Sequence, residues 1–146
     1  MPSFEETRIL PCSARHVYDV VMDIEAYPDF LPWLHAARIL TRKDDELTAE
    51  LVAEFAGIHH AFQTIDRYLP PKLIEVRLLE GPFRHLDSLW TFEEIGEHSC
   101  RVHFSIEFEF KNPVLSLVAS PIFSSACRSM VHVFEERAMK LYEKTS

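Results

Sequence analysis

From Cys100 to Phe110 the chain alternates without a break between apolar and polar side chains. Consecutive side chains of a β-strand point to opposite faces of a sheet, so this alternation predicts a strand with one apolar and one hydrated face. The range 47–55 shows the same period, and the ranges 74–78 and 86–94 follow it in part. Strands that are apolar on one side only are typical of antiparallel sheets, whereas strands of parallel sheets are apolar on both faces. We therefore expect an antiparallel meander.

Turn-forming residues separate these ranges, and a further strand is expected over 4–10 at the start of the chain. Glycine and proline are the residues that most often interrupt regular structure. The interruptions lie at Gly57, Pro70-Pro71, Gly81-Pro82 and Gly96. The sequence therefore predicts a sheet of about seven strands.

Two amphipathic helices can cover the apolar side of this sheet. Ser13 is placed to cap a helix that ends near Ile24. Asn112 and Pro113 have the residue types of an N-cap and a first helical position. Pro121 predicts a kink or a restart in this last helix, because an interior proline removes a backbone hydrogen bond. The apolar stripe of the last helix consists of Phe123, Cys127, Met130, Phe134, Ala138 and Leu141.

These elements predict an α+β fold of the helix-grip type, in which a bent antiparallel sheet surrounds a long C-terminal helix. The length of 146 residues suits a single domain spanning 1–146. A bent sheet and a helix that do not meet everywhere leave a cavity between them. Such cavities are the default sites for ligands.

Composition excludes several classes of function. The chain has 3 Gly and 11 Phe, and its glycines are too scattered to form a phosphate-binding loop. A formal net charge of −8 opposes the neutralisation of phosphates, so we expect no direct contact with DNA or other nucleic acid. Three cysteines without a CxxC pair indicate free thiols and a cytoplasmic location. We expect neither a signal peptide nor a membrane span, because no apolar run has the required length and flanks.

Candidate catalytic and metal-binding side chains do not form a recognisable site. His59 and His60 are adjacent and would point to opposite faces of a strand, so one metal ion could not readily bind both. His98 lies in a predicted turn. Cys100 and Cys127 lie on predicted apolar faces, where a thiol behaves as a small hydrophobic group. We expect no catalytic residue and no metal ion.

The segment 27–33, Tyr-Pro-Asp-Phe-Leu-Pro-Trp, follows the first helix. Its two prolines prevent one regular helix, so a turn or a single helical turn presents its large apolar side chains. Such side chains either complete the core or line the mouth of a cavity, and the pattern alone is compatible with both.

This segment begins a series of motifs that resembles a known family over roughly residues 3–143. The series is the string Tyr27 to Trp33, then Gly81-Pro82-Phe83, Leu86, Trp90-Thr91-Phe92 and Phe108-Glu109-Phe110. In this order it is similar to the coenzyme-Q-binding START-like family, which is part of the polyketide cyclase/dehydrase and lipid-transport superfamily.

The resemblance implies a single START-like domain that encloses an apolar tunnel. Members of the family bind ubiquinone or a related isoprenoid lipid, as a ligand and not as a cofactor, and support respiration and ubiquinone synthesis without catalysis. Close bacterial relatives are ribosome-association toxins that block subunit joining, so contact with the ribosome is an alternative. An enzyme of the cyclase/dehydratase type is a second alternative, because a fold alone does not decide function.

Delivery of a lipid would also require transient contact with a membrane surface, at the periphery of the inner membrane. The Pro-rich segment 27–33 and the range 114–122 carry apolar side chains that could make this contact.

The inward faces of the predicted strands suit an uncharged lipid, because a site for an isoprenoid tail needs aromatic and aliphatic side chains. Each candidate also has the residue type of an ordinary core position. The expected lining is Phe30, Leu31, Trp33, Leu51, Phe55, Trp90, Phe104, Ile106, Phe108, Met130 and Phe134.

Overall fold

The computed structural model describes residues 3–55 and 57–145, with side chains up to Leu141, and within this part seven strands form one antiparallel sheet. The strands are β1 (Ser3–Leu10), β2 (Leu34–Arg42), β3 (Glu46–Phe55), β4 (Ile58–Leu69), β5 (Leu73–Glu80), β6 (Phe83–Gly96) and β7 (Ser99–Phe110). Their order is β1-β7-β6-β5-β4-β3-β2, so β2 to β7 form a meander and β1 pairs with the last strand. The expected antiparallel meander is confirmed.

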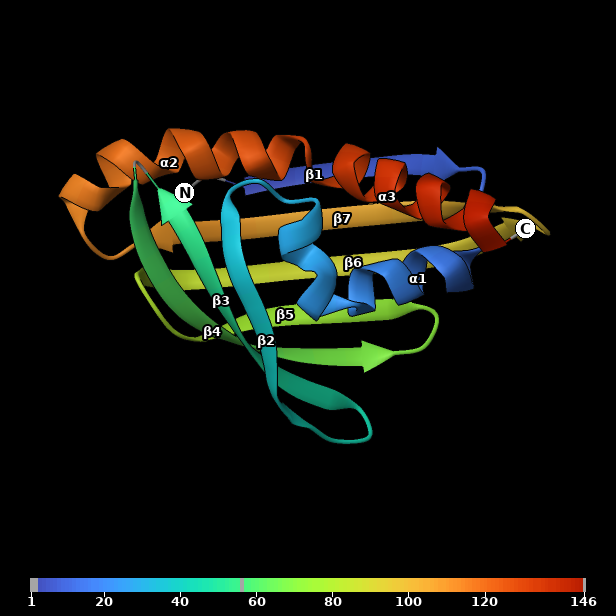
Figure 1. The fold of residues 1–146 in the computed structure, drawn as a ribbon, viewed down its shortest axis with the longest axis horizontal. Coiled ribbons are helices and arrows are strands. Elements are labelled where there is room, and N and C mark those ends of the chain that lie inside the picture. Colours follow the sequence, from blue (N-terminus) through green and yellow to red (C-terminus); the bar gives the residue numbers. More distant parts are fainter. Residues whose placement is uncertain (1–2, 56, 146) are drawn as a thin grey trace.

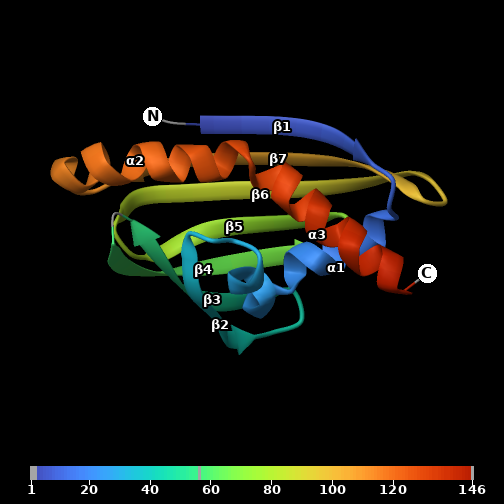
Figure 2. The same ribbon diagram turned by 45° about the horizontal axis from the view of Figure 1, so that its top comes forward.

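Helices lie along the concave side of this sheet (Figure 1). They are α1 (Ala14–Met22), the 3-10 helix η1 (Ile24–Asp29), α2 (Pro113–Arg128) and α3 (Met130–Thr145). α1 and η1 connect the two edges of the sheet, and α2 and α3 follow one another across it (Figure 2). The helix-grip architecture is confirmed, although the expected long C-terminal helix is divided into two.

The predicted apolar faces are buried. In β7 the six apolar residues of one parity, from Cys100 to Phe110, are all buried. In β3 the same parity places Leu47, Ala53 and Phe55 in the core. The local period of two therefore determines which side of each strand faces the helices.

The first helix begins as expected, because the Ser13 hydroxyl accepts a hydrogen bond from the His16 backbone N–H at 3.2 Å. The Ala14 N–H donates to the Glu94 carboxylate at 3.0 Å, which places the helix N-terminus against β6. The His16 ring nitrogen Nε2 lies 2.8 Å from the Ala138 carbonyl oxygen of α3. These contacts hold α1 between the sheet and α3.

The break in the C-terminal helix lies at Ser129, and the helix does not restart at Pro121, although a restart is one of the two outcomes expected there. α2 runs through Pro121, which is exposed, so water can reach the backbone carbonyl that lacks its usual donor. At Ser129 the hydroxyl donates to the carbonyls of Ser125 and Ala126, both at 3.2 Å. Such back-bonding bends helices, and α2 and α3 meet at 47°.

Within the described residues, no individual helix is both long and apolar enough to cross a bilayer. α2 and α3 up to Leu141 meet the criteria of length and composition only as a bent pair.

Candidate functional site

A cavity of about 100 Å³ lies between the concave face of the sheet, η1 and α3. Eight of the residues predicted to line a ligand site surround it. They are Leu31, Trp33, Leu51, Trp90, Phe104, Ile106, Met130 and Phe134. The segment 27–33 contributes Tyr27, Leu31 and Trp33, so part of this segment forms the wall and part packs behind it.

Phe30, Phe55 and Phe108 lie outside the cavity wall. Phe30 packs on the ring of Phe134, with centroids 5.1 Å apart, and the Arg137 guanidinium covers its ring at 5.1 Å. Phe55 and Phe108 are fully buried against Phe123 at the end of the sheet where α2 begins. Phe55 and Phe108 have the inward parity, but they pack on Phe123, and it is Phe123 that lines the cavity.

Further residues line the cavity that the sequence did not predict as lining, although Tyr27, Leu86 and Phe123 belong to the motifs and the apolar stripe described above. They are Ile24, Tyr27, Leu34, Ala49, Phe62, Thr64, Asp66, Val76, Leu86, Ser88 and Phe123. Most are aliphatic or aromatic and are indistinguishable in sequence from core residues. Phe62, Thr64 and Asp66 alternate along β4, so the same period of two could have placed a carboxyl group inside.

Asp66 contributes a carboxyl group to the cavity wall, and this residue is 5% exposed. The Thr64 hydroxyl donates to Asp66 Oδ1 at 2.9 Å. Burial raises the pKa of Asp66 from 3.8 to about 6, and this hydrogen bond opposes the rise because it favours the ionised form. A carboxylic acid with such a pKa exchanges its proton near neutral pH.

Tyr27 is the other titratable side chain of the wall. Its hydroxyl donates a hydrogen bond to the Val21 carbonyl oxygen, which joins η1 to α1. Burial raises the pKa of Tyr27 well above 10, and the charges of Asp66 and Asp23 raise it further. Among the lining side chains in the described part of the chain there is no Lys, Arg or His. The cavity therefore offers hydrogen-bonding groups without a positive charge.

A larger depression of about 480 Å³ lies on the outer side of the sheet, where Glu75, Arg77 and Asp87 form part of its lining. Arg77 Nε lies 3.4 Å from Glu75 Oε1 and 3.9 Å from Asp87 Oδ1, and Glu5 and Glu107 add two further carboxylates to a lining that is therefore polar and acidic. The inner cavity has the apolar wall that small-molecule sites share, and it is the candidate site.

In the part of the chain that the structure describes, the cysteines and histidines form neither a reactive thiol nor a metal-binding cluster. Burial raises the pKa of Cys100 to about 11 and that of Cys127 to about 12, so these thiols are not nucleophiles at neutral pH. His59 is exposed and stacks on His35, with ring centroids 4.3 Å apart. The described residues contain no group of three or more His, Cys, Asp or Glu side chains placed to hold a metal ion.

Comparison with known proteins identifies relatives of this chain. The family model described as polyketide cyclase / dehydrase and lipid transport matches residues 10–135. Ribosome association toxin RatA of Pseudomonas aeruginosa is 33% identical over 138 residues, which cover 94% of this chain and 96% of that protein. Coenzyme Q-binding protein COQ10 homolog B, mitochondrial, of Xenopus laevis is 28% identical over 143 residues, which cover 95% of this chain and 59% of that protein.

Solved structures share the fold. A START superfamily protein from Mycobacterium smegmatis superposes with a TM-score of 0.78 at 23% identity, covering 95% of this chain and 98% of that one. The Zhui aromatase/cyclase from Streptomyces sp. R1128 has a TM-score of 0.79 at 17% identity, covering 95% of this chain and 94% of that one. Since the family model matches most of the chain and RatA is similar over nearly its full length, this chain belongs to the polyketide cyclase / dehydrase and lipid transport family.

Proposed function

We propose that this protein binds a hydrophobic small molecule in the cavity between the sheet and α3 and releases it chemically unchanged. Ubiquinone or a related isoprenoid lipid is the ligand, in support of respiratory electron transport and ubiquinone synthesis. The observation that carries the proposal is a cavity whose wall is mainly aromatic and aliphatic, with few polar groups. The name of the COQ10 homologue supports the quinone as the ligand.

The cavity has to widen when the ligand enters. Its volume of about 100 Å³ is below the roughly 300–1,000 Å³ of pockets that enclose a small ligand. α3 supplies Met130 and Phe134 to the wall, and the break at Ser129 lies directly before it. An outward movement of α3 about this break would enlarge the cavity without changing the sheet.

Both tryptophans of the chain, Trp33 and Trp90, line the cavity, which provides a direct assay. Titration with a short-tailed ubiquinone should quench tryptophan fluorescence, and lipid extraction with mass spectrometry should identify any copurified ligand. The variant Trp90→Phe should lose part of the quenching while still binding. If no quinone or isoprenoid copurifies with the protein and none binds when it is added, the proposal is wrong.

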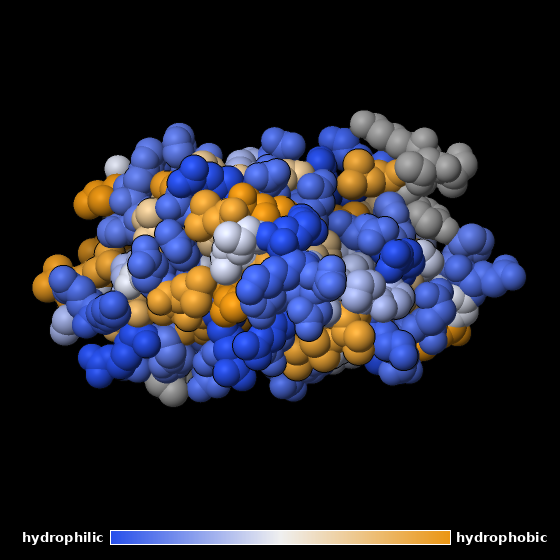
Figure 3. Space-filling model, turned by 90° about the horizontal axis from the view of Figure 1, so that it is seen from below, coloured by the Kyte–Doolittle hydropathy of each residue, from blue (hydrophilic) through white to orange (hydrophobic). Residues whose placement is uncertain are grey.

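Contact with a membrane is part of the proposed delivery, and the outer face of α2 is suited to it. Val114, Leu117, Val118 and Ile122 recur at helical spacing and are exposed, with Leu117 81% exposed. α2 contains no acidic residue although the chain has a net charge of −8. In Figure 3 apolar groups interrupt the polar surface at several places, including the end of the molecule where α2 begins.

Flotation with anionic liposomes tests this contact. The variant Leu117→Gln should reduce the fraction of protein that floats. The control Leu69→Gln changes a leucine of β4 that is 58% exposed and should have no effect. Equal flotation of all three proteins, or none of any, would rule out this face of α2 as the contact.

A role at the ribosome is the second candidate function, because RatA is similar over nearly the whole chain. The net charge of −8 opposes contact with ribosomal RNA, so the contact would be made with basic ribosomal proteins. Sedimentation of ribosomal subunits in a sucrose gradient, with this protein in excess, tests this ribosomal role. A loss of joined ribosomes would support the ribosomal role, and an unchanged profile would exclude it.

A catalytic role of the cyclase/dehydratase type is a third candidate, because Asp66 is a carboxyl group with a raised pKa inside the cavity. One acid that exchanges its proton near neutral pH is sufficient for general acid or base catalysis. Mass spectrometry of the bound ligand before and after incubation decides between the roles. A ligand of altered mass would overturn the non-enzymatic proposal.

A further inference from the structure

We propose that Asp66 and Ser88 form the polar end of the cavity and bind the uncharged, oxygen-bearing head of a lipid, with the carboxylic acid of Asp66 donating a hydrogen bond to a carbonyl or hydroxyl oxygen of that head. This inference rests on the proposed function. It identifies which end of the ligand the protein recognises and which side chains do so.

The strand register places the polar groups in one row across the sheet. Asp66 on β4 is paired with Val76 on β5, and Val76 is paired with Ser88 on β6. All three line the cavity. Neighbouring strands lie about 4.8 Å apart, so the two polar residues stand about 10 Å apart across a small valine. This separation leaves room for a ring that carries oxygen atoms on opposite sides.

Thr64 fixes the Asp66 side chain at one end of this row. Its hydroxyl donates to Oδ1 and is almost completely buried. This bond occupies one carboxyl oxygen of a group that forms part of the cavity wall. A ligand in the cavity could hydrogen-bond to the other oxygen, Oδ2, and so compensate for the burial of the carboxyl group.

The groups that face Asp66 determine which heads the site accepts. Its strand neighbours are Leu47 on β3 and Val76 on β5, and from η1 the titratable group is Tyr27, whose hydroxyl is bonded to the Val21 carbonyl. The described lining contains no cationic side chain, so a carboxylate or phosphate head would be buried without a counter-charge. The site therefore excludes fatty acids and phospholipids by their polar end and accepts a neutral head.

The pH dependence of binding distinguishes a neutral head from a cationic one, because each binds a different protonation state of Asp66. A carbonyl oxygen accepts a hydrogen bond from the protonated acid only, so a quinone should bind more tightly at low pH. An amine would instead pair with the carboxylate and bind more tightly at high pH. Because burial raises the pKa of Asp66 to about 6, both directions can be measured where the fold is expected to be intact.

Fluorescence titration with a short-tailed ubiquinone at about pH 5 and about pH 8 tests the proposal. Wild-type protein should bind about tenfold more tightly at the lower pH, the usual effect of one hydrogen bond. Asp66→Asn keeps a donor but cannot titrate, so its binding should not depend on pH. Asp66→Leu should bind about tenfold more weakly than wild type at about pH 5. The control Asp87→Asn lies on the outer face of β6 and should keep the wild-type pH dependence.

A saturated isoprenoid hydrocarbon without oxygen serves as the second probe, and its binding should be the same for all variants. Carbon-13 NMR of the Asp66 carboxyl group should show its pKa rising when the quinone binds. Quinone binding that is independent of pH and equal in Asp66→Leu would overturn this inference and leave the proposed function standing. Tighter binding at high pH would also overturn it, and failure of wild type to bind either probe would overturn the proposed function itself.

Discussion

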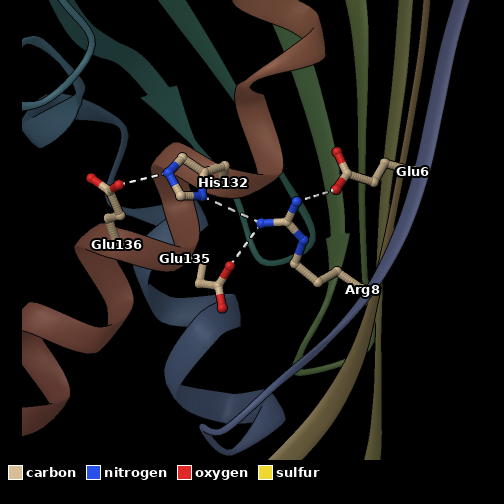
Figure 4. Close-up of polar contacts among 5 residues, drawn as sticks. All are labelled: Glu6, Arg8, His132, Glu135 and Glu136. Atoms are coloured by element: carbon tan, nitrogen blue, oxygen red, sulfur yellow. Dashed lines mark hydrogen bonds and ion pairs between the residues drawn. The ribbon is translucent and has the colours of Figure 1, made fainter.

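The guanidinium Nη1 of Arg8 lies 2.7 Å from Oε1 of Glu135, and this ion pair joins strand β1 to helix α3 (Figure 4). The same guanidinium contacts Glu6 through Nη2 at 2.7 Å. His132 Nδ1 lies 3.5 Å from it, and the other ring nitrogen pairs with Glu136 at 2.6 Å. Arg8 therefore holds together two carboxylates at the position where α3 crosses the edge of the sheet.

Replacement of Arg8 should loosen α3. Arg8→Met should lower the free energy of unfolding by about 1 kcal/mol, because the substitution leaves the carboxylates of Glu6 and Glu135 without a counter-charge. The loss is small because these ion pairs are only partly shielded from water. Urea unfolding at low and high salt measures this loss, which should shrink at high salt. Arg15→Met is the control, because Arg15 lies 3.8 Å from Asp19 in an exposed pair. Equal losses for both variants would contradict a special role of Arg8.

Phe134 should be the most costly side chain of α3 to remove. Its ring lies 5.3 Å from that of Tyr27, 5.1 Å from that of Phe30 and 5.2 Å from that of Trp90, measured between centroids. Phe134→Ala should lower the free energy of unfolding by about 3–5 kcal/mol, because the contacts are lost and a cavity remains. Phe134→Leu should cost clearly less. Urea unfolding monitored by circular dichroism measures both, and equal losses would show that ring packing is unimportant here.

The two glycines with positive φ should respond differently to alanine. At Gly81 (φ 151°) a Cβ atom would overlap Phe62 Cβ and lie 3.1 Å from Phe62 Cα. Gly81→Ala should therefore cost about 3 kcal/mol or more, from backbone strain and from displacement of Phe62. At Gly57 (φ 79°) no atom lies within 4 Å of such a Cβ. Gly57→Ala should cost only about 1 kcal/mol of strain. Thermal unfolding of the two variants measures this difference. A larger loss of stability in Gly57→Ala than in Gly81→Ala would refute the explanation.

The thiols should be unreactive in the folded protein. All three cysteines are free and buried, and burial raises the pKa of Cys100 to about 11 and that of Cys127 to about 12, with a rise for Cys12 as well. At about pH 8 the thiolate fractions of Cys100 and Cys127 are about 100-fold or more below that of an ordinary cysteine. A chromogenic thiol reagent should modify the native protein that much more slowly than the unfolded chain. Rapid modification of one native thiol would show that its surroundings open.

Asp66 should make the stability depend on pH. Its pKa is about 6 in the folded protein against an ordinary 3.8, so between these values the unfolded chain releases the proton while the folded protein keeps it. Stability therefore falls as the pH rises from about 4 to about 6, by about 3 kcal/mol in total. Urea unfolding at about pH 4 and about pH 8 should show this loss in wild type and not in Asp66→Asn. The loss persisting in Asp66→Asn would assign it to other groups.

Much of the fold could be predicted because its signals are local. The alternation from Cys100 to Phe110 determined which face of β7 is buried, and Ser13 and Asn112 determined where helices begin. The motifs from Tyr27 to Trp33 and around Trp90 indicate the family. Each of these signals depends on residues a few positions apart, so the sequence by itself was sufficient.

Tertiary structure decided the rest, because it depends on contacts between distant residues. Phe55 and Phe104 both face inward, but Phe104 lines the cavity whereas Phe55 packs on Phe123, a residue of α2 that is distant in sequence. The helix continues through Pro121, where the free carbonyl is accessible to water, and breaks at Ser129, where a hydroxyl competes for backbone carbonyls. Asp66 could be assigned to the inner face from its position in β4. Its raised pKa arises only when β3, β5 and η1 enclose it in a wall without a positive charge.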